Sequence, residues 1–186
     1  MKKQIRVLSK NPEKIREIKE ILDSNDIEVI SNKTKIEEIQ TENVHHLIED
    51  KALKAYKKIG RPLIVEHTGL YIDKINGLPG GLTQIFWDTL QADKFAEIFG
   101  ASDKSSKAKA KTIVCYVDGK KFKTFEGEIN GYIIDKPRGS KDFQWDCVFV
   151  PDDYDQTFAE MGHDKKNNIS MRKIALSKFA EYLNKE

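Results

Sequence analysis

The sequence predicts an α/β protein with a mixed β-sheet and a cleft between two lobes. Two observations predict this class. Strand and helix patterns are interleaved along the chain, and a long hairpin pattern in the second half indicates that part of the sheet is antiparallel. The 186 residues suffice to bury a core, so we expect residues 1–186 to form a single two-lobed domain.

The strand patterns are short apolar runs that end in polar or turn residues. They cover residues 4–9, 27–30, 63–65, 70–73 and, as a hairpin, 112–125. The pair Asp118-Gly119 favours the tight turn of that hairpin. The run at 63–65 ends in a polar segment, residues 66–68, and residues 76–81 form a turn or loop.

The helix patterns carry apolar residues at intervals of three and four. They cover a segment that opens at Pro12, residues 42–59, residues 92–99 and residues 165–183. Asn11 is a favourable N-cap for the first helix, and Pro12 takes the first helical position, where its missing N–H costs little. Gly60-Arg61-Pro62 ends the second helix.

Composition argues against several functional classes. The net charge is only +2, from 32 basic and 30 acidic residues, so the chain lacks the drive for counterion release of a nucleic-acid-coating protein. No apolar run approaches the roughly 20 residues that a membrane span needs, and the charged N-terminus lacks the apolar core of a signal peptide. Cys115 and Cys147 show no metal-binding spacing. We therefore expect reduced core thiols in a cytoplasmic protein that binds neither nucleic acid nor membrane.

The segment from Ser9 to Lys14 places a helix N-terminus directly after a strand. Free backbone N–H groups and the positive end of the helix dipole attract phosphate at such a junction. Asn11 supplies a further donor, and Lys14 lies one turn on, within reach of the same anion. An ordinary helix cap with a solvated lysine also explains the pattern.

Glu42 and Glu66, with Asp73, are candidate ligands of Mg²⁺, a hard cation that prefers oxygen. Glu66 follows an apolar strand, where open α/β sheets usually carry ligand groups. Glu42 has a second explanation, because the helix dipole favours a carboxylate in the first turn. His67 stands next to Glu66 and can act as a base near neutral pH.

Phe143, Trp145 and Asp146 lie in a polar loop. Aromatic rings in a loop suit stacking on a base, and a nearby carboxylate can accept hydrogen bonds. The two rings can equally cover the core. Lys166 and Arg172 share the first two turns of the last predicted helix, where a solvated face is the simpler explanation.

In their order along the chain, these motifs resemble the inosine triphosphate pyrophosphatase (Ham1-like) family over nearly its whole length. The resemblance rests on Ser9-Lys10-Asn11-Pro12-Glu13-Lys14, Val65-Glu66-His67-Thr68-Gly69-Leu70, Asn76-Gly77-Leu78-Pro79-Gly80, Asp142-Phe143-Gln144-Trp145-Asp146 and Ser170-Met171-Arg172. It implies an elongated central mixed sheet flanked by helices, a nucleotide cleft between the lobes and a homodimer. It also implies Mg²⁺-dependent hydrolysis of purine nucleoside triphosphates such as ITP, XTP and dITP to monophosphate and pyrophosphate.

The resemblance implies a role for each site residue. The phosphates would be held by Asn11, Lys14, Lys54 and Lys166. The metal would be held by Glu42 and Glu66. The base would be sandwiched by Phe143 and Trp145 and contacted by Asp146 and Arg172. The other substrate-binding positions are Ser9, Thr68, Gln144 and Met171, and the catalytic set is Lys14, Glu66 and His67.

Four positions depart from the family pattern. His67 stands where the family usually has a second carboxylate, which is thought to activate water or complete the metal site. Met171 replaces a base-reading histidine, and Gln144 and Cys147 replace a glycine and a proline of the base-binding loop. We therefore expect retained nucleotide binding with an altered base preference.

Two other functions stay open. A catalytically weakened nucleotide-binding or regulatory protein would keep the cleft without efficient turnover, since His67 carries no negative charge and is a poorer Mg²⁺ ligand than a carboxylate. A binder of RNA or DNA ends would use the lysines, although the balanced charge counts against it.

Overall fold

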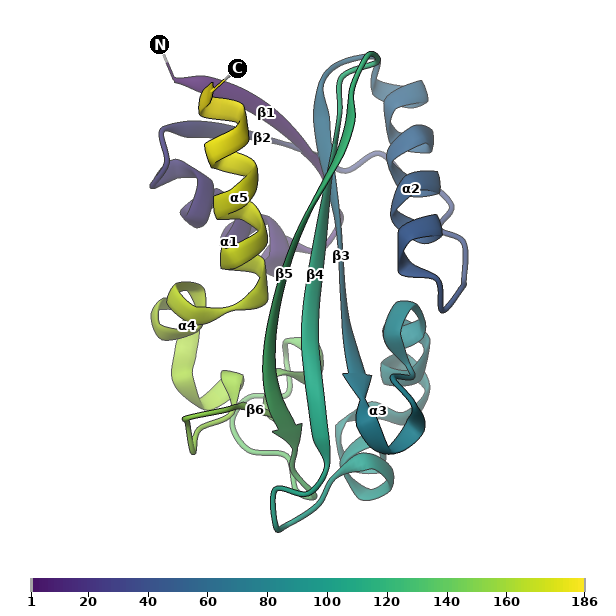
Figure 1. Ribbon diagram of the computed structural model, residues 1–186, viewed down its shortest axis with the longest axis vertical. Helices are drawn as coiled ribbons and strands as arrows, with labels where there is room; N and C mark the ends of the chain where they lie inside the picture. Colours follow the sequence, from purple (N-terminus) through teal and green to yellow (C-terminus); the bar gives the residue numbers. More distant parts are fainter. Residues whose placement is uncertain (1, 186) are drawn as a thin grey trace.

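A six-stranded mixed sheet forms the spine of the computed structural model, which describes residues 2–185 (Figure 1). The strand order is β2-β1-β3-β4-β5-β6. The strands are β1 Lys3–Leu8, β2 Ile27–Asn32, β3 Leu63–Ile72, β4 Lys107–Val117, β5 Phe122–Ile133 and β6 Phe149–Pro151. The helices are α1 Pro12–Asp23, α2 Val44–Ile59, α3 Thr83–Phe99, α4 Phe158–Ile169 and α5 Met171–Lys185. The predicted α/β class is confirmed. Among the described helices, none is both long and apolar enough to cross a membrane.

Helix α1 begins where the local sequence predicts. The side-chain oxygen of Asn11 accepts hydrogen bonds from the backbone N–H groups of Glu13 (3.0 Å) and Lys14 (3.1 Å). Pro12 occupies the first turn, where no N–H donor is needed. The cap is therefore confirmed, and it turns the chain directly from the end of β1 into the helix.

Strand β3 is longer than predicted and does not end at Val65. It runs to Ile72 and pairs antiparallel with β4 along its whole length, with Glu66 opposite Val114. Of the polar residues after Val65, Glu66 and Thr68 are hydrogen-bonded to each other and to Arg172 within the strand's buried surroundings. Strand β1 pairs with only Leu63 and Ile64 of β3, so the edge of β3 beyond Ile64 is not paired with β1. The candidate site lies beside this edge.

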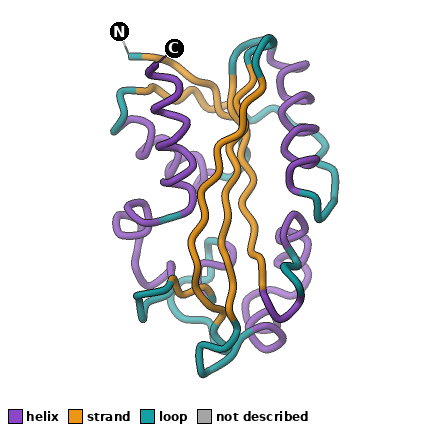
Figure 2. Tube along the Cα trace, in the orientation of Figure 1, coloured by secondary structure: helices purple, strands orange, loops and turns teal. Residues whose placement is uncertain are grey.

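Alternate side chains of β3 face opposite layers. Ile64 packs in the core beneath α1 and α5, whereas Leu63 and Val65 pack against α2. Figures 1 and 2 show these helices on opposite sides of the long strands. At the other end of the strands, α3 and α4 enclose a separate core that contains Trp145 and Phe158. Both cysteines are buried and free.

The last predicted helix, residues 165–183, is wrong as a single element. The structure has α4 and α5, separated at Ser170, whose backbone is extended (φ −68°, ψ 155°). The Oγ of Ser170 accepts from the backbone N–H of Lys173 at 3.1 Å and thereby caps α5. Lys166 therefore ends one helix while Arg172 begins the next. The first half of α3 and the short β6 were also not predicted.

Candidate active site

The first pocket lies where β1 ends and β3 continues, and we call it the basic pocket. It is lined by Leu8, Ser9, Lys10, Asn11, Lys14, Thr34, Ile36, Glu38, Lys51, Glu66, Gln84 and Gln144. The N-terminus of α1 opens into it, and Ser9 Oγ accepts from the backbone N–H of Asn11 at 3.2 Å. Three lysines thus surround a helix N-terminus, an arrangement that favours an anion.

Glu66 is the most constrained carboxylate of the basic pocket. Its Oε1 lies 2.8 Å from Lys14 Nζ, and its Oε2 lies 3.2 Å from Arg172 Nη2. The Thr68 hydroxyl donates to the same Oε2 at 2.8 Å. Burial alone would raise the pKa of Glu66, but Lys14 and Arg172 outweigh it and hold the pKa well below its ordinary value. Glu66 is therefore ionised and neutralised by its partners.

Glu38 supplies the second carboxylate of this pocket. Its Oε2 lies 2.5 Å from Lys51 Nζ, which also donates to the backbone carbonyl of Glu66 at 3.1 Å. Burial opposes ionisation of Glu38, but His67 and Lys51 together lower its pKa to about 2. Glu38 comes from the segment between β2 and α2, which has no regular structure, so no periodic pattern marked it.

His67 lies on the other side of the sheet from Glu66, because adjacent strand residues point to opposite faces. Its Nδ1 is 3.7 Å from Glu38 Oε1, and it is not among the residues that line the basic pocket. Only 6% of the residue is exposed, and this burial lowers the pKa of the imidazole. His67 is therefore next to Glu66 in the sequence, but its side chain does not share the pocket with Glu66. It contacts Glu38 instead.

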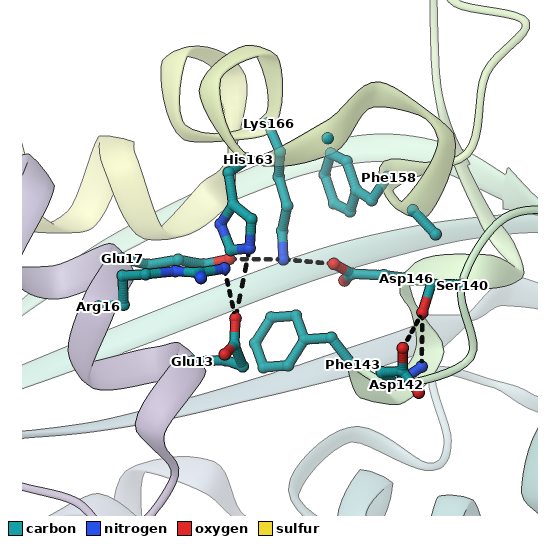
Figure 3. Close-up of a pocket in the computed structure, with 12 residues that line it drawn as sticks. Glu13, Arg16, Glu17, Ser140, Asp142, Phe143, Asp146, Phe158, His163 and Lys166 are labelled. Carbon is teal, nitrogen blue, oxygen red and sulfur yellow. Dashed lines mark hydrogen bonds and ion pairs between the residues drawn. The ribbon is translucent and has the colours of Figure 1, made fainter.

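The second pocket, of about 460 Å³, is the aromatic pocket. It is lined by Glu13, Arg16, Glu17, Ser140, Asp142, Phe143, Asp146, Phe158, Ala159, Gly162, His163 and Lys166. The Nζ of Lys166 lies 4.1 Å from the centre of the Phe143 ring and reaches between two carboxylates (Figure 3). These are Glu17 at 2.8 Å and Asp146 at 2.5 Å.

A chain of buried ion pairs joins the floors of the two pockets. From Lys166 it passes through Glu17 and Arg172 to Glu66, and ends at Lys14 in the basic pocket. Glu17, from α1, contacts Lys166 of α4 and Arg172 of α5. Burial alone would raise the pKa of Glu17, but Arg172 and Lys166 lower it below its ordinary value. Glu13 and Lys14, and likewise Phe143 and Gln144, are consecutive residues that line one pocket each, so the two pockets adjoin, and we call them together the cleft.

Several predicted substrate-binding residues lie beneath this cleft rather than in it. Trp145 is 2% exposed and packs its ring on Phe149 and Phe158, so Phe143 and Trp145 do not form the expected sandwich. Met171 is also part of the apolar core. Thr68 and Arg172 are buried, and both donate hydrogen bonds to the carboxylate of Glu66.

Two further predicted site residues, Glu42 and Lys54, lie outside both pockets. Glu42 is exposed, and its carboxylate accepts only from Thr41, at 3.5 Å, among the described residues; Glu38 lines the pocket instead. Lys54 pairs with Asp50 at 2.7 Å and lies outside both pockets, whereas Lys51 lines the basic pocket. By contrast, Ser9, Asn11, Lys14, Glu66, Phe143, Gln144, Asp146 and Lys166 all line the cleft.

Glu17 and Phe158 were missed. Glu17 lies three residues after Lys14 on α1 and therefore shares its face, a spacing that could have drawn attention to it. Phe158 begins α4 directly after the capping-box residue Thr157, and the Thr157–Glu160 spacing is a local signal that predicts a helix start there.

Fold and site together define a mixed α/β protein whose cleft joins a basic pocket, with two carboxylates, to an aromatic pocket. Residues 5–182 match the model of the Ham1 family. The chain belongs to the Ham1 family, as the motifs indicated.

Individual members of known name and structure agree with this assignment. The chain is 35% identical to the dITP/XTP pyrophosphatase of Methanopyrus kandleri, over 91% of this chain and 90% of that protein. It is 36% identical to the inosine triphosphate pyrophosphatase of Yarrowia lipolytica, over 93% and 92% respectively. The solved structure of a HAM1 protein from Coxiella burnetii matches it with a TM-score of 0.82 at 27% identity, covering 99% of this chain and all of that one.

Proposed function

We propose that this protein hydrolyses purine nucleoside triphosphates, such as ITP, XTP or dITP, to the monophosphate and pyrophosphate. The observation that carries the proposal is the single cleft with an aromatic pocket at one end and a basic pocket at the other. A base and a triphosphate need these two environments side by side. The relatives named dITP/XTP and inosine triphosphate pyrophosphatases support the same reaction.

The triphosphate would lie in the basic pocket. The positive end of the α1 dipole lies at this pocket, and Lys10, Lys14 and Lys51 supply positive charge. Lys14 and Lys51 are now paired with Glu66 and Glu38. Phosphate oxygens would compete for the same ammonium groups. Substrate binding would therefore weaken the ion pairs of Glu66 with Lys14 and of Glu38 with Lys51.

The donor set of this pocket fits a divalent cation such as Mg²⁺. Glu38 and Glu66 are ionised carboxylates, and Mg²⁺ is usually bound through one or two carboxylates together with substrate phosphates. Among residues 2–185, no three acidic, His or Cys side chains form a group that could hold a metal, so phosphate oxygens of the substrate would have to complete the coordination. When bound, the ion would neutralise the charge that develops on the phosphates.

His67 would act on this site through Glu38. Its pKa is lowered by burial, so the imidazole is neutral at physiological pH, and its Nε2 has no hydrogen-bond partner among the described residues. The nearest carboxylate is Glu38. We therefore assign His67 to positioning Glu38 rather than to taking a proton from the attacking water.

The base would lie in the aromatic pocket. Phe143 offers a ring face for stacking, and Asp146 and Lys166 offer a hydrogen-bond acceptor and a donor at the pocket floor. Trp145 would support this site only from below, since it packs in the core.

A second candidate is a nucleotide-binding protein with slow turnover. Its specific support is the state of Glu66, which contacts Lys14, Arg172 and Thr68 and is next to a histidine that faces the other layer. The pocket therefore lacks a second carboxylate adjacent to Glu66 on the strand. His67→Asp would raise turnover many-fold if this candidate is right, and would lower it if His67 positions Glu38 as proposed.

The test is a panel of nucleoside triphosphates, canonical and deaminated, incubated with Mg²⁺, with pyrophosphate and orthophosphate quantified separately. We expect pyrophosphate as the product and a preference for ITP or XTP. Pyrophosphate released only from triphosphates with a canonical base would mean that the pocket prefers a different base. Binding without any product would favour the second candidate.

A further inference from the structure

Gln144 ties the loop between the two pockets to α3. Its Nε2 donates to Gln84 Oε1 at 2.5 Å, and Gln84 Nε2 donates to Asp88 Oδ1 at 2.7 Å. The carboxylate of Asp88 only accepts, so it fixes which end of the Gln84 amide faces Gln144. The NH₂ group of Gln144 is therefore directed at α3.

The other end of the same amide is an unused acceptor. Within residues 2–185, Gln144 Oε1 accepts no hydrogen bond, and both Gln144 and Gln84 line the basic pocket. The residue before it, Phe143, lines the aromatic pocket. Gln144 thus lies at the junction of the two pockets. On α1, the consecutive residues Glu13 and Lys14 mark the same junction, since each lines one of the two pockets.

The sugar of a nucleotide joins the base to the phosphates. If the base occupies the aromatic pocket and the phosphates occupy the basic pocket, the sugar must lie at this junction. This step rests on the proposed function. A sugar hydroxyl is a donor, and Gln144 Oε1 is an acceptor that Gln84 holds in place by its other end.

We propose that Gln144 is a sugar-reading residue that accepts a hydrogen bond from a hydroxyl of the bound nucleotide. The backbone of Gln144 has φ of 45°, a conformation that glycine adopts more easily than other residues. A long amide is therefore kept at a position whose backbone favours glycine, in agreement with a role for the side chain.

The experiment compares kcat/KM for ITP with those for its 2′-deoxy and 3′-deoxy analogues, in wild type, Gln144→Gly and Gln144→Leu. For wild type, removal of the contacted hydroxyl should lower kcat/KM by about two- to tenfold, the range for one net hydrogen bond. In both variants, the ratio of kcat/KM for ITP to kcat/KM for the deoxy analogue should be close to one. Glycine fits the backbone, and leucine keeps the bulk without the acceptor. Thermal unfolding of each variant verifies that the loop still folds.

Two results would overturn the proposal. Equal sugar ratios in wild type and both variants would mean that Gln144 does not contact the sugar. A ratio retained in Gln144→Leu but lost in Gln144→Gly would mean contact by bulk rather than a hydrogen bond. If wild type hydrolyses nothing, the same ratios are measured as dissociation constants. Sugar-dependent binding that is lost in both variants would then support this inference while the proposed hydrolysis fails.

Discussion

The basic and aromatic pockets contain the same kinds of charged residue but hold them differently. In the basic pocket, the side chains of Lys51, Glu38 and Lys14 remain 14%, 31% and 15% exposed, and only Glu66 among its charged pairs is nearly buried, at 4%. In the floor of the aromatic pocket, Lys166 and Glu17 are 3% and 0% exposed. The partly exposed charges of the basic pocket can exchange partners with a ligand. The buried charges in the floor of the aromatic pocket cannot be separated without leaving a buried ion unpaired, which costs several kcal/mol.

The strongest test of this contrast is Arg172→Ala. Arg172 is the buried cation that both Glu17 and Glu66 contact. Its removal leaves two buried carboxylates short of a partner, so we expect the free energy of unfolding to fall by about 3–5 kcal/mol, measured by urea denaturation. The exposed pair of Lys94 and Glu97 is the control. Lys94→Ala should cost less than about 1 kcal/mol, and equal losses in the two variants would contradict the contrast.

Substitutions of the two aromatic residues of the loop should have different effects, one on stability and the other on nucleotide binding. Trp145→Ala removes a ring from the core and should cost about 3–5 kcal/mol of unfolding free energy. Phe143→Ala, in the half-exposed pocket wall, should instead weaken nucleotide binding by about 1–3 kcal/mol for every base, because stacking tolerates base identity. Thermal unfolding and nucleotide titration of both variants measure this. A loss of affinity confined to one base in Phe143→Ala would mean that the ring does not stack as proposed.

Glu38 and Glu42 test which carboxylate serves the basic pocket. Glu38→Ala should lower the apparent affinity for Mg²⁺ in turnover by at least about tenfold, since even residues that only support metal ligands contribute this much. Glu42→Ala should leave it unchanged, because Glu42 is exposed and lies outside the pocket. The measurement is the initial rate of pyrophosphate release as a function of Mg²⁺ concentration. The opposite order would restore Glu42 as the ligand.

Lys51 and Lys54 form a matched pair on successive turns of α2. Lys51→Ala should weaken triphosphate binding by about tenfold, the equivalent of 1.4 kcal/mol, and Lys54→Ala should have little effect, since Lys54 pairs with Asp50 outside the cleft. The dissociation constant of a non-hydrolysable triphosphate measures both. Equal effects would mean that the net charge of α2, rather than the position of one lysine, decides binding.

Local rules were enough for part of the molecule. The cap of α1 by Asn11 and the proline at its first turn depend on neighbours a few residues apart, and both lie where predicted. The Asp118-Gly119 pair lies in the predicted hairpin loop, but this loop covers residues 118–121, because Val117 pairs with Phe122. The positions of Ser9 and Lys14 in the basic pocket follow from the same junction. These features were predictable because backbone hydrogen bonds and φ preferences act over short distances.

What the sequence by itself determined is therefore the class of fold, the family and the strand-to-helix junction that opens the basic pocket. Only the tertiary structure decided which of two neighbouring residues enters the cleft: Glu38 rather than Glu42, Lys51 rather than Lys54, and Phe143 rather than Trp145. It also extended β3 through Glu66, which placed His67 on the opposite face. The reason is physical. A local pattern specifies the kind of element, but the side of it that meets a cavity depends on packing and ion pairing between segments more than a hundred residues apart, as between Glu17 and Arg172.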